Sequence, residues 1–215
     1  MSSNKTTQGP ENGQQRGKGF SRRTFMQGVG AGSTAAAVLT PAAQAAPPPS
    51  PVGPGPVPMT LKINGKTHSV KLEPRVTLID ALRNNLDYTG AKKVCDRATC
   101  GSCTVIVDGN AVYSCTMLAI EAQGRDIQTI EGFTAPAKMH PVSENFVKHD
   151  AQQCGFCTPG FVTACKALLD KNPNPTMAEV EKGLSGNICR CGTYVGVRQA
   201  ALEAAQQMRG GRRGD

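Results

Sequence analysis

The sequence contains no tryptophan, and aromatic residues make up only 4% of its 215 positions. Basic residues outnumber acidic ones by eight, but the lysines and arginines form no stripe interleaved with aromatic side chains. This pattern argues against nucleic-acid binding. Half of the net charge, +4, belongs to residues 1–45, so much of the basicity lies at the start of the chain. The length permits one or two domains.

Histidine is also scarce. His68, His140 and His149 are scattered, and no metalloprotease, catalytic-triad or phosphate-loop motif surrounds any of them. Each is best explained as a surface or packing residue. The sequence therefore predicts no catalytic residue, and any chemistry on a substrate is expected in a partner.

Residues 1–45 have the pattern of an export signal. Arg22 and Arg23 precede an apolar run at 28–39, and Ala-Gln-Ala at 43–45 closes it. Adjacent arginines are typical of a twin-arginine signal, which exports proteins already folded in the cytoplasm. The apolar run is shorter than the ~20 residues that span a bilayer, so we expect no stable membrane span after cleavage. An uncleaved membrane anchor is the alternative.

Cysteine, by contrast, is abundant, with nine residues. Cys95, Cys100 and Cys103 follow the spacing C-x4-C-x2-C, and Cys115 comes after a hairpin-like segment. This is the plant-type ligand spacing for a [2Fe–2S] cluster, in which each of two irons takes two thiolates from the protein. A structural zinc site, which usually uses two C-x2-C pairs, is the alternative.

The elements predicted around this first quartet form a compact α+β unit over residues 59–134. Asn64-Gly65 and Asp108-Gly109 are hairpin turns between alternating segments, and Thr77 opens an amphipathic helix. Hairpin, helix, cysteine loop, hairpin and final strand are the order of a β-grasp ferredoxin. The Pro-rich residues 46–58 before it form an extended linker. The predicted strands are 59–63, 67–72, 104–107, 111–114 and 126–130, and the predicted helices are 77–88 and 117–121.

Residues 135–215 are predicted to be all-α, with four helices and a second cysteine quartet. The spacing joins a C-x2-C pair to a C-x-C pair, which is unusual for zinc. Gly155 and Gly192 let the backbone approach inorganic sulfur atoms, so the pattern favours a second [2Fe–2S] cluster, with zinc as the alternative. Three of the predicted helices are 141–150, 159–170 and 194–208. The remaining one, third in chain order, is capped by Thr176 and ends before Gly186-Asn187. The quartet is Cys154, Cys157, Cys189 and Cys191.

Cys165 belongs to neither quartet. It shares one helix face with Phe161 and Leu168, which predicts a position in the core. The export signal makes disulfides an alternative for all nine cysteines. Closely spaced C-x-C and C-x2-C pairs are poor geometry for a disulfide within one loop.

Three stretches give the chain its resemblance to a known family: C-D-x3-C-G-S-C-T-V at 95–105, Q-C-G-F-C-T-P-G at 153–160 and L-S-G-N-I-C-R-C-G-T-Y at 184–194. Over residues 59–208 the chain resembles the small iron–sulfur subunit of the xanthine oxidase family of molybdenum hydroxylases. With its leader it is most similar to periplasmic aldehyde oxidoreductases. Isoquinoline-type and carbon monoxide-type dehydrogenases are the neighbouring possibilities.

The resemblance implies an electron relay. Electrons would pass from molybdopterin, the molybdenum cofactor of a large subunit, through two [2Fe–2S] clusters to an FAD-binding subunit or an external acceptor. It implies that Gln153 hydrogen-bonds the pterin and that Cys191 lies on the electron path. The sequence departs from the family pattern at two places: the loop 97–99 lacks the extra glycines common in the family, and Phe161 stands where many members have Gln or Met. These departures leave the subfamily, and so the substrate, less defined. A stand-alone exported ferredoxin-like carrier is the alternative, although it would need only the first quartet.

Overall fold

A computed structural model describes Arg23, Pro51 and residues 53–134 and 139–211. The predicted leader, apart from Arg23, and residues 46–50 and 52 of the predicted linker lie outside these residues. The chain divides into two units, residues 1–50 and 51–215, and all elements described below belong to the second. Within the described residues, no helix combines the length and the apolar character needed to cross a bilayer.

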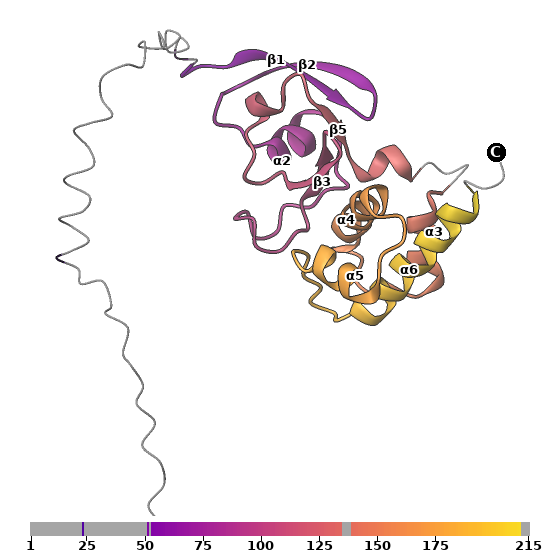
Figure 1. Cartoon of the computed structure of the whole chain (residues 1–215). Helices are drawn as coiled ribbons and strands as arrows, with labels where there is room; N and C mark the ends of the chain where they lie inside the picture. Colours follow the sequence, from indigo (N-terminus) through magenta and orange to yellow (C-terminus); the bar gives the residue numbers. More distant parts are fainter. Residues whose placement is uncertain (1–22, 24–50, 52, 135–138, 212–215) are drawn as a thin grey trace, which may run out of the picture. The chain divides into compact units, whose positions relative to one another are not determined.

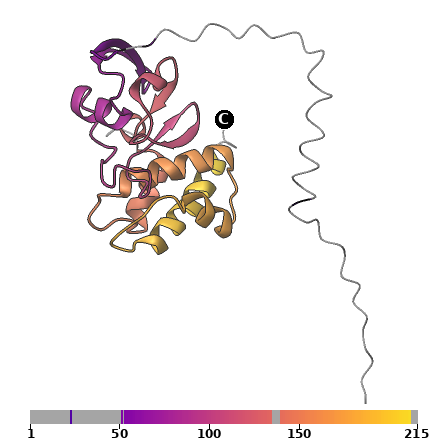
Figure 2. The ribbon, with the colours of Figure 1, turned by 90° about the vertical axis from the view of Figure 1, so that its left-hand side faces the viewer.

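Five strands form one mixed sheet in the order β2-β1-β5-β3-β4 (Figures 1 and 2). The central pair, β1 and β5, is parallel, and the other neighbours are antiparallel. This arrangement confirms the α+β, β-grasp prediction. The strands are β1 (Val57–Ile63), β2 (Lys66–Leu72), β3 (Thr104–Val107), β4 (Asn110–Tyr113) and β5 (Asp126–Gln128).

The first hairpin follows directly from the sequence pattern. Met59, Leu61 and Ile63 alternate along β1 and are at most 2% exposed, as expected for a strand with one face on a core. Asn64 and Gly65 both have positive φ, 50° and 77°. Two such residues form the tight turn whose twist matches antiparallel strands. The predicted hairpin is therefore confirmed.

One short helical segment crosses the sheet. It begins as α2 (Leu78–Asp80), capped by Thr77, and continues as the π-helix η1 (Ala81–Asn85). Leu78, Ile79 and Leu82 are completely buried in the core of this sheet. The predicted helix was expected to reach residue 88, but Asp87 has a φ of +58°, which ends the helix earlier.

The end of the sheet region differs from the prediction in its bounds. The predicted helix at 117–121 is the 3₁₀ turn η2 (Ala119–Ala122), and the last strand ends at Gln128 rather than at residue 130. The Thr129 amide donates to Asn64 Oδ1 instead of continuing the ladder. A second 3₁₀ turn, η3 (Ile130–Phe133), follows at once.

Four α-helices make up the second half of the described chain, as predicted: α3 (Pro141–Lys148), α4 (Thr158–Lys171), α5 (Met177–Leu184) and α6 (Tyr194–Gly211). The Thr176 and Glu179 side chains cap α5 reciprocally, the arrangement expected of a capping box. Phe146 and Phe161 fill the core between the helices, and the predicted core residue Cys165 is completely buried there.

The helix α4 packs against β3 and β4, which brings the two halves of the second unit together (Figure 1). The contact is close because Gly160, in the first turn of α4, lies against the loop before β3. A Cβ atom on Gly160 would lie 2.4 Å from the carbonyl oxygen of Gly101. Only glycine permits this approach.

Candidate iron–sulfur sites

The first quartet is assembled by one loop and one hairpin. Cys95, Cys100 and Cys103 lie on the loop between η1 and β3, and Cys115 lies two residues after β4. The end of the β3–β4 hairpin ties these parts together. The Ser114 hydroxyl donates to the Cys103 carbonyl oxygen at 2.7 Å, and the Ser114 amide donates to the same oxygen at 3.3 Å.

The cysteine loop points backbone amides at sulfur. The Ala98 amide donates to Cys115 Sγ at 3.3 Å, and the Thr99 amide donates to Cys95 Sγ at 3.4 Å. The loop achieves this through left-handed φ values at Asp96, Ala98 and Gly101, of 56°, 52° and 71°. Amides aimed at thiolates stabilise negative charge and tune a cluster held there.

The thiols of the first quartet differ in their proton affinity. Hydrogen bonding to the Arg97 backbone, and then to that of Thr99, lowers the pKa of Cys95 to about 6. Burial raises the pKa of Cys103 to about 12, and the adjacent Cys115 thiol contributes to the increase. The same contacts show that Cys95 lies beside Cys100 and Cys103 beside Cys115. These are two sulfur pairs, as a cluster of two irons requires.

The second quartet is assembled from two loops that flank helices. Cys154 and Cys157 precede α4, and Cys189 and Cys191 precede α6. Burial raises the pKa of Cys157 to about 12, and Cys189 lies beside it. The pKa of Cys154 is lowered by the Phe156 backbone first and then by its contact with Cys191. Each sulfur pair therefore joins the two loops.

Cys189 is stabilised as a thiolate by Thr193, the residue just before α6. Burial opposes ionisation, but the Thr193 hydroxyl, 3.2 Å from Cys189 Sγ, and its backbone amide lower the pKa of Cys189 to about 7. Gly155 and Gly192 both have left-handed φ values, 77° and 80°, and a Cβ atom on either would meet no heavy atom within 4 Å. Both loops thus turn at a glycine next to a cysteine of the quartet, with open space on the Cβ side.

The donor set fits two [2Fe–2S] clusters: eight cysteines, paired two by two, with amides and left-handed turns around them. Iron binding deprotonates coordinating thiols outright, so the raised thiol pKa values do not prevent ligation, and loading releases protons. In the described parts of the chain, no three His, Cys, Asp or Glu side chains gather around a position suited to a single metal ion. The ligand roles of individual cysteines remain predictions.

The two sites differ in exposure. In the first, Cys103 and Cys115 are buried. In the second, Cys154 and Cys191 are exposed, and so is the predicted pterin contact Gln153. Four apolar residues within four positions of the second quartet's cysteines are also exposed, and we call them the apolar rim. Their exposed fractions are 53% for Phe156, 47% for Ile188, 39% for Tyr194 and 61% for Val195.

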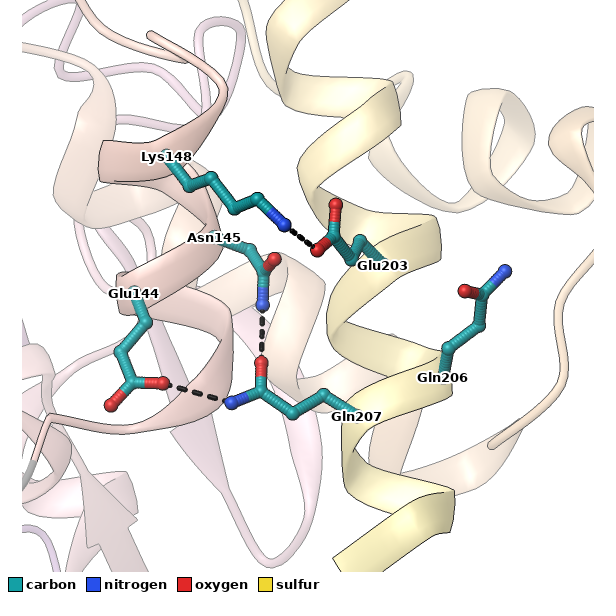
Figure 3. Close-up of a pocket in the computed structure, with 6 residues that line it drawn as sticks. All are labelled: Glu144, Asn145, Lys148, Glu203, Gln206 and Gln207. Carbon is teal, nitrogen blue, oxygen red and sulfur yellow. Dashed lines mark hydrogen bonds and ion pairs between the residues drawn. The ribbon is translucent and has the colours of Figure 1, made fainter.

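A separate polar pocket of about 540 Å³ lies between α3 and α6. Figure 3 shows that its side chains, apart from Gln206, are tied to one another across the two helices. Asn145 Nδ2 donates to Gln207 Oε1 at 2.7 Å, and Lys148 forms an ion pair with Glu203. None of the cysteines lines this pocket, and these ties join α3 to α6.

Two protein-family models match the chain. A "2Fe-2S iron-sulfur cluster binding domain" matches residues 61–129, and a "[2Fe-2S] binding domain" matches residues 129–202. Together they cover both cysteine quartets. The matches support iron–sulfur clusters at both sites.

Curated relatives align over most of the chain. The aldehyde oxidoreductase iron-sulfur-binding subunit PaoA of Escherichia coli O157:H7 is 40% identical over 207 residues, covering 88% of this chain and 90% of PaoA. The nicotine 6-hydroxylase small subunit of Paenarthrobacter nicotinovorans is 43% identical over 152 residues, covering 71% and 92%. The chain belongs to the small iron–sulfur subunits of the xanthine oxidase family of molybdenum hydroxylases. The predicted resemblance is confirmed.

The solved structures agree. The structure of quinoline 2-oxidoreductase from Pseudomonas putida 86 aligns with a TM-score of 0.70 at 38% identity, covering 73% of this chain and 98% of the matched chain. As a small subunit of this family, the chain is the electron-transfer component of an oxidoreductase complex. Its fold, a ferredoxin-like sheet region followed by a helical [2Fe–2S]-binding region, is the one predicted.

Sequence reasoning missed the residues that join the two sites. Gly186 and Asn187 are predicted only as the end of a helix, and Gly101 only as part of the cysteine motif. In the structure, Asn187 is buried against Gly101. No local periodicity signals a contact between residues so far apart in the chain.

Proposed function

We propose that this chain relays electrons from a molybdopterin-bearing large subunit, through its two [2Fe–2S] clusters, to an FAD-binding subunit or an external acceptor, during aldehyde oxidation. A bound [2Fe–2S] cluster accepts and returns one electron at a time. The chain's own residues hold the clusters, direct amides at the sulfurs and form the surfaces on which partners dock.

The exposed second site carries this proposal. Cys154 and Cys191 are exposed, and so are the residues of the apolar rim, Phe156, Ile188, Tyr194 and Val195, which are near them in the chain. Apolar side chains exposed together around a redox site are typical of a partner surface. A large subunit seated there would place its pterin against Gln153 and next to Cys191, and it would remove the cluster from water.

Electrons would leave through the first site. Its less buried sulfur pair is Cys95 and Cys100. Next to them Val94 is 52% exposed, and the exposed Arg97 donates from Nε to the Cys95 carbonyl oxygen at 3.1 Å. We assign the docking of the flavin subunit, or of an external acceptor, to this edge.

We further propose that the chain works in the periplasm after folded export by the twin-arginine route. The likeness to PaoA supports a related leader, because 88% coverage exceeds what residues 59–215 alone can supply. The alignment therefore extends into residues before Met59. Folded export also suits the clusters, which are inserted in a reducing compartment.

Hydroxylation of a nitrogen heterocycle is the second candidate function. The nicotine 6-hydroxylase small subunit is slightly more identical than PaoA, 43% against 40%, although over a shorter stretch. The aldehyde proposal is preferred because of the longer alignment. In both cases the substrate would be bound by the large subunit.

The complex purified from its natural source tests the proposal. We expect this chain to co-purify with a molybdenum-containing large chain, and benzaldehyde to bleach the iron–sulfur absorption while nicotine does not. Bleaching by nicotine alone would replace aldehyde oxidation with the second candidate. A chain that purifies alone, with both clusters present and no molybdenum, would contradict the subunit assignment and favour a stand-alone carrier.

A further inference from the structure

Three backbone segments, each next to cysteines of a quartet, meet at Gly101. Gly101 lies between Cys100 and Cys103, Gly160 follows Cys157 at the start of α4, and the segment 186–188 precedes Cys189. A Cβ atom on Gly101 would lie 2.6 Å from both the Gly186 carbonyl oxygen and Asn187 Nδ2. The segments are thus closer than any other residue type would allow.

Asn187 is the polar centre of this contact. Its side chain is only 6% exposed, and its Nδ2 donates to the Gly101 carbonyl oxygen at 2.9 Å and to Thr104 Oγ1 at 3.3 Å. The Thr104 hydroxyl donates to the same carbonyl oxygen at 2.6 Å. The buried amide group therefore donates to the first cysteine loop and to the first residue of β3.

The hydrogen bonds on either side of Asn187 join the 186–188 segment to the first cysteine loop and to β4. The Ile188 amide donates to the Cys100 carbonyl oxygen at 2.9 Å, and the Tyr113 hydroxyl donates to the Gly186 carbonyl oxygen at 3.0 Å. Cys100 belongs to the first quartet, and Ile188 precedes Cys189 of the second. The hydrogen bond from Ile188 to Cys100 therefore connects the residue before Cys189, in the second site, to the backbone of a predicted ligand in the first site.

Local helix capping does not explain the Asn187 side chain. Its backbone amide, which donates to the Leu184 carbonyl oxygen at 3.0 Å, already closes the end of α5. The side chain instead reaches residues more than eighty positions earlier in the sequence. The Asn187 side chain therefore fixes the position of the 186–188 segment on the first cysteine loop.

We propose that Asn187 is a positioning residue for electron transfer between the two clusters: it holds the Ile188 amide on the Cys100 carbonyl and so sets the separation and the bonded route between the sites. The proposal rests on the presence of both clusters. In this role Asn187 acts through the backbone of Cys100 and Ile188, and not through a sulfur atom of either quartet.

The test compares Asn187→Ala with Asn145→Ala in the intact complex. Asn145 is a matched control because it is also buried, at 2% exposure, and its Nδ2 also makes two hydrogen bonds. One goes to Pro141 O at 2.8 Å, and the other, drawn in Figure 3, goes to Gln207 Oε1 at 2.7 Å. The first bond lies within α3 and the second joins α3 to α6, so neither of them joins the two cysteine loops. A merely structural loss should therefore affect both variants alike.

Three readouts decide the outcome: iron and sulfide content, hydrogen exchange at the Ile188 amide, and the magnetic splitting between the two reduced clusters in electron paramagnetic resonance. We expect Asn187→Ala to keep its iron, to exchange the Ile188 amide roughly tenfold faster, as expected for the loss of one buried hydrogen bond, and to show an altered splitting. Asn145→Ala should change neither the Ile188 exchange nor the splitting.

Unchanged exchange and splitting in Asn187→Ala, with full iron content, would overturn the proposal, and so would equal changes in both variants. If Asn187→Ala loses a cluster, Tyr113→Phe decides instead, because it removes only the hydroxyl that holds Gly186. It should shift the splitting in the same direction by a smaller amount, and an unaltered splitting would contradict the proposal. Absence of iron from the wild-type chain would instead refute the cluster assignment itself.

Discussion

The backbone amide of Ala98 donates to Cys115 Sγ across 3.3 Å, and it does so from a residue whose φ is +52°. Left-handed backbone is costly for any residue with a Cβ atom, by about 1–2 kcal/mol. The sequence lacks glycine at positions 97–99, so this loop aims its amide at sulfur at the expense of backbone strain. The relationship can be tested without touching a cysteine.

Replacing Ala98 with glycine should stabilise the cluster-bound chain by about 1 kcal/mol, because glycine adopts this φ without strain. The readout is the midpoint temperature for loss of the visible iron–sulfur absorption, which should rise. Ala81→Gly is the control: Ala81 has a φ of −60° and is fully buried, so that variant should lower the midpoint. A lower midpoint for Ala98→Gly would show that the loop is not strained at this residue.

Changing Cys103 to serine should remove one of the two clusters. Cys103 and Cys115 form the buried sulfur pair of the first site, so losing one thiolate would leave one iron with a single protein ligand. We expect about half of the iron to be lost and one of two signals to disappear from the electron paramagnetic resonance spectrum. A complete two-signal spectrum would refute the assignment.

Cys165→Ala is the matched control for that experiment. Cys165 is as buried as Cys103 but lies on α4 in the helical core, outside both quartets. Its removal creates a small cavity and should lower stability by about 1 kcal/mol. Both cluster signals should remain, and the loss of either would mean that Cys165 takes part in ligation.

Gln153 offers a test of the proposed pterin contact. Gln153→Ala should leave both clusters in place and slow their reduction by substrate, because the side chain is exposed beside Cys154 and the contact is made to the partner. The neighbouring exposed Gln152 provides the control, since Gln152→Ala should leave the rate unchanged. Stopped-flow absorption in the intact complex measures both. Equal rates for Gln153→Ala and wild type would exclude the contact.

His140 makes the stability of α3 depend on pH. Its Nδ1 accepts from the Val142 amide at 3.2 Å, so the capping ring is neutral. Burial and then the charge of Lys166 lower the pKa of His140 below 6.5, although Asp170 and Glu144 oppose the shift. The unfolded state therefore binds more protons between the two pKa values. The free energy of unfolding rises with pH through this window, and the contribution is lost as the pH falls below 6.5.

The measurement is the urea midpoint from about pH 5 to pH 7, the range in which histidine titrates. His140→Asn should have a flatter profile than wild type, because asparagine caps a helix without titrating. An identical slope in the two proteins would show that His140 does not contribute the pH dependence.

Much of this fold could be predicted because the relevant signals are local. Asn64-Gly65 and Asp108-Gly109 specify their hairpins, Thr176 and Glu179 specify a cap, and the cysteine spacings specify two quartets. The ends of η1 and β5 could not be predicted in the same way. They depend on the backbone conformation of Asp87 and on a hydrogen bond from the Thr129 amide to Asn64, which lies far away in the sequence.

The link between the sites was beyond sequence patterns for the same reason. The contact of Asn187 with Gly101 depends on how α4 packs against β3, and no periodicity within either segment reports it.

The leader is a different case. Its predicted role rests on Arg22 and Arg23, and it stays a prediction that cell fractionation can test: changing both arginines to lysine should retain the chain in the cytoplasm, and normal export would contradict the twin-arginine route.

The central claim is that eight cysteines hold two diiron clusters. Quantifying iron and acid-labile sulfide in the purified, anaerobically reconstituted chain tests it most directly. We predict about four irons and about four sulfides per chain. Near-zero sulfide, with zinc or disulfides taking up the cysteines, would contradict it.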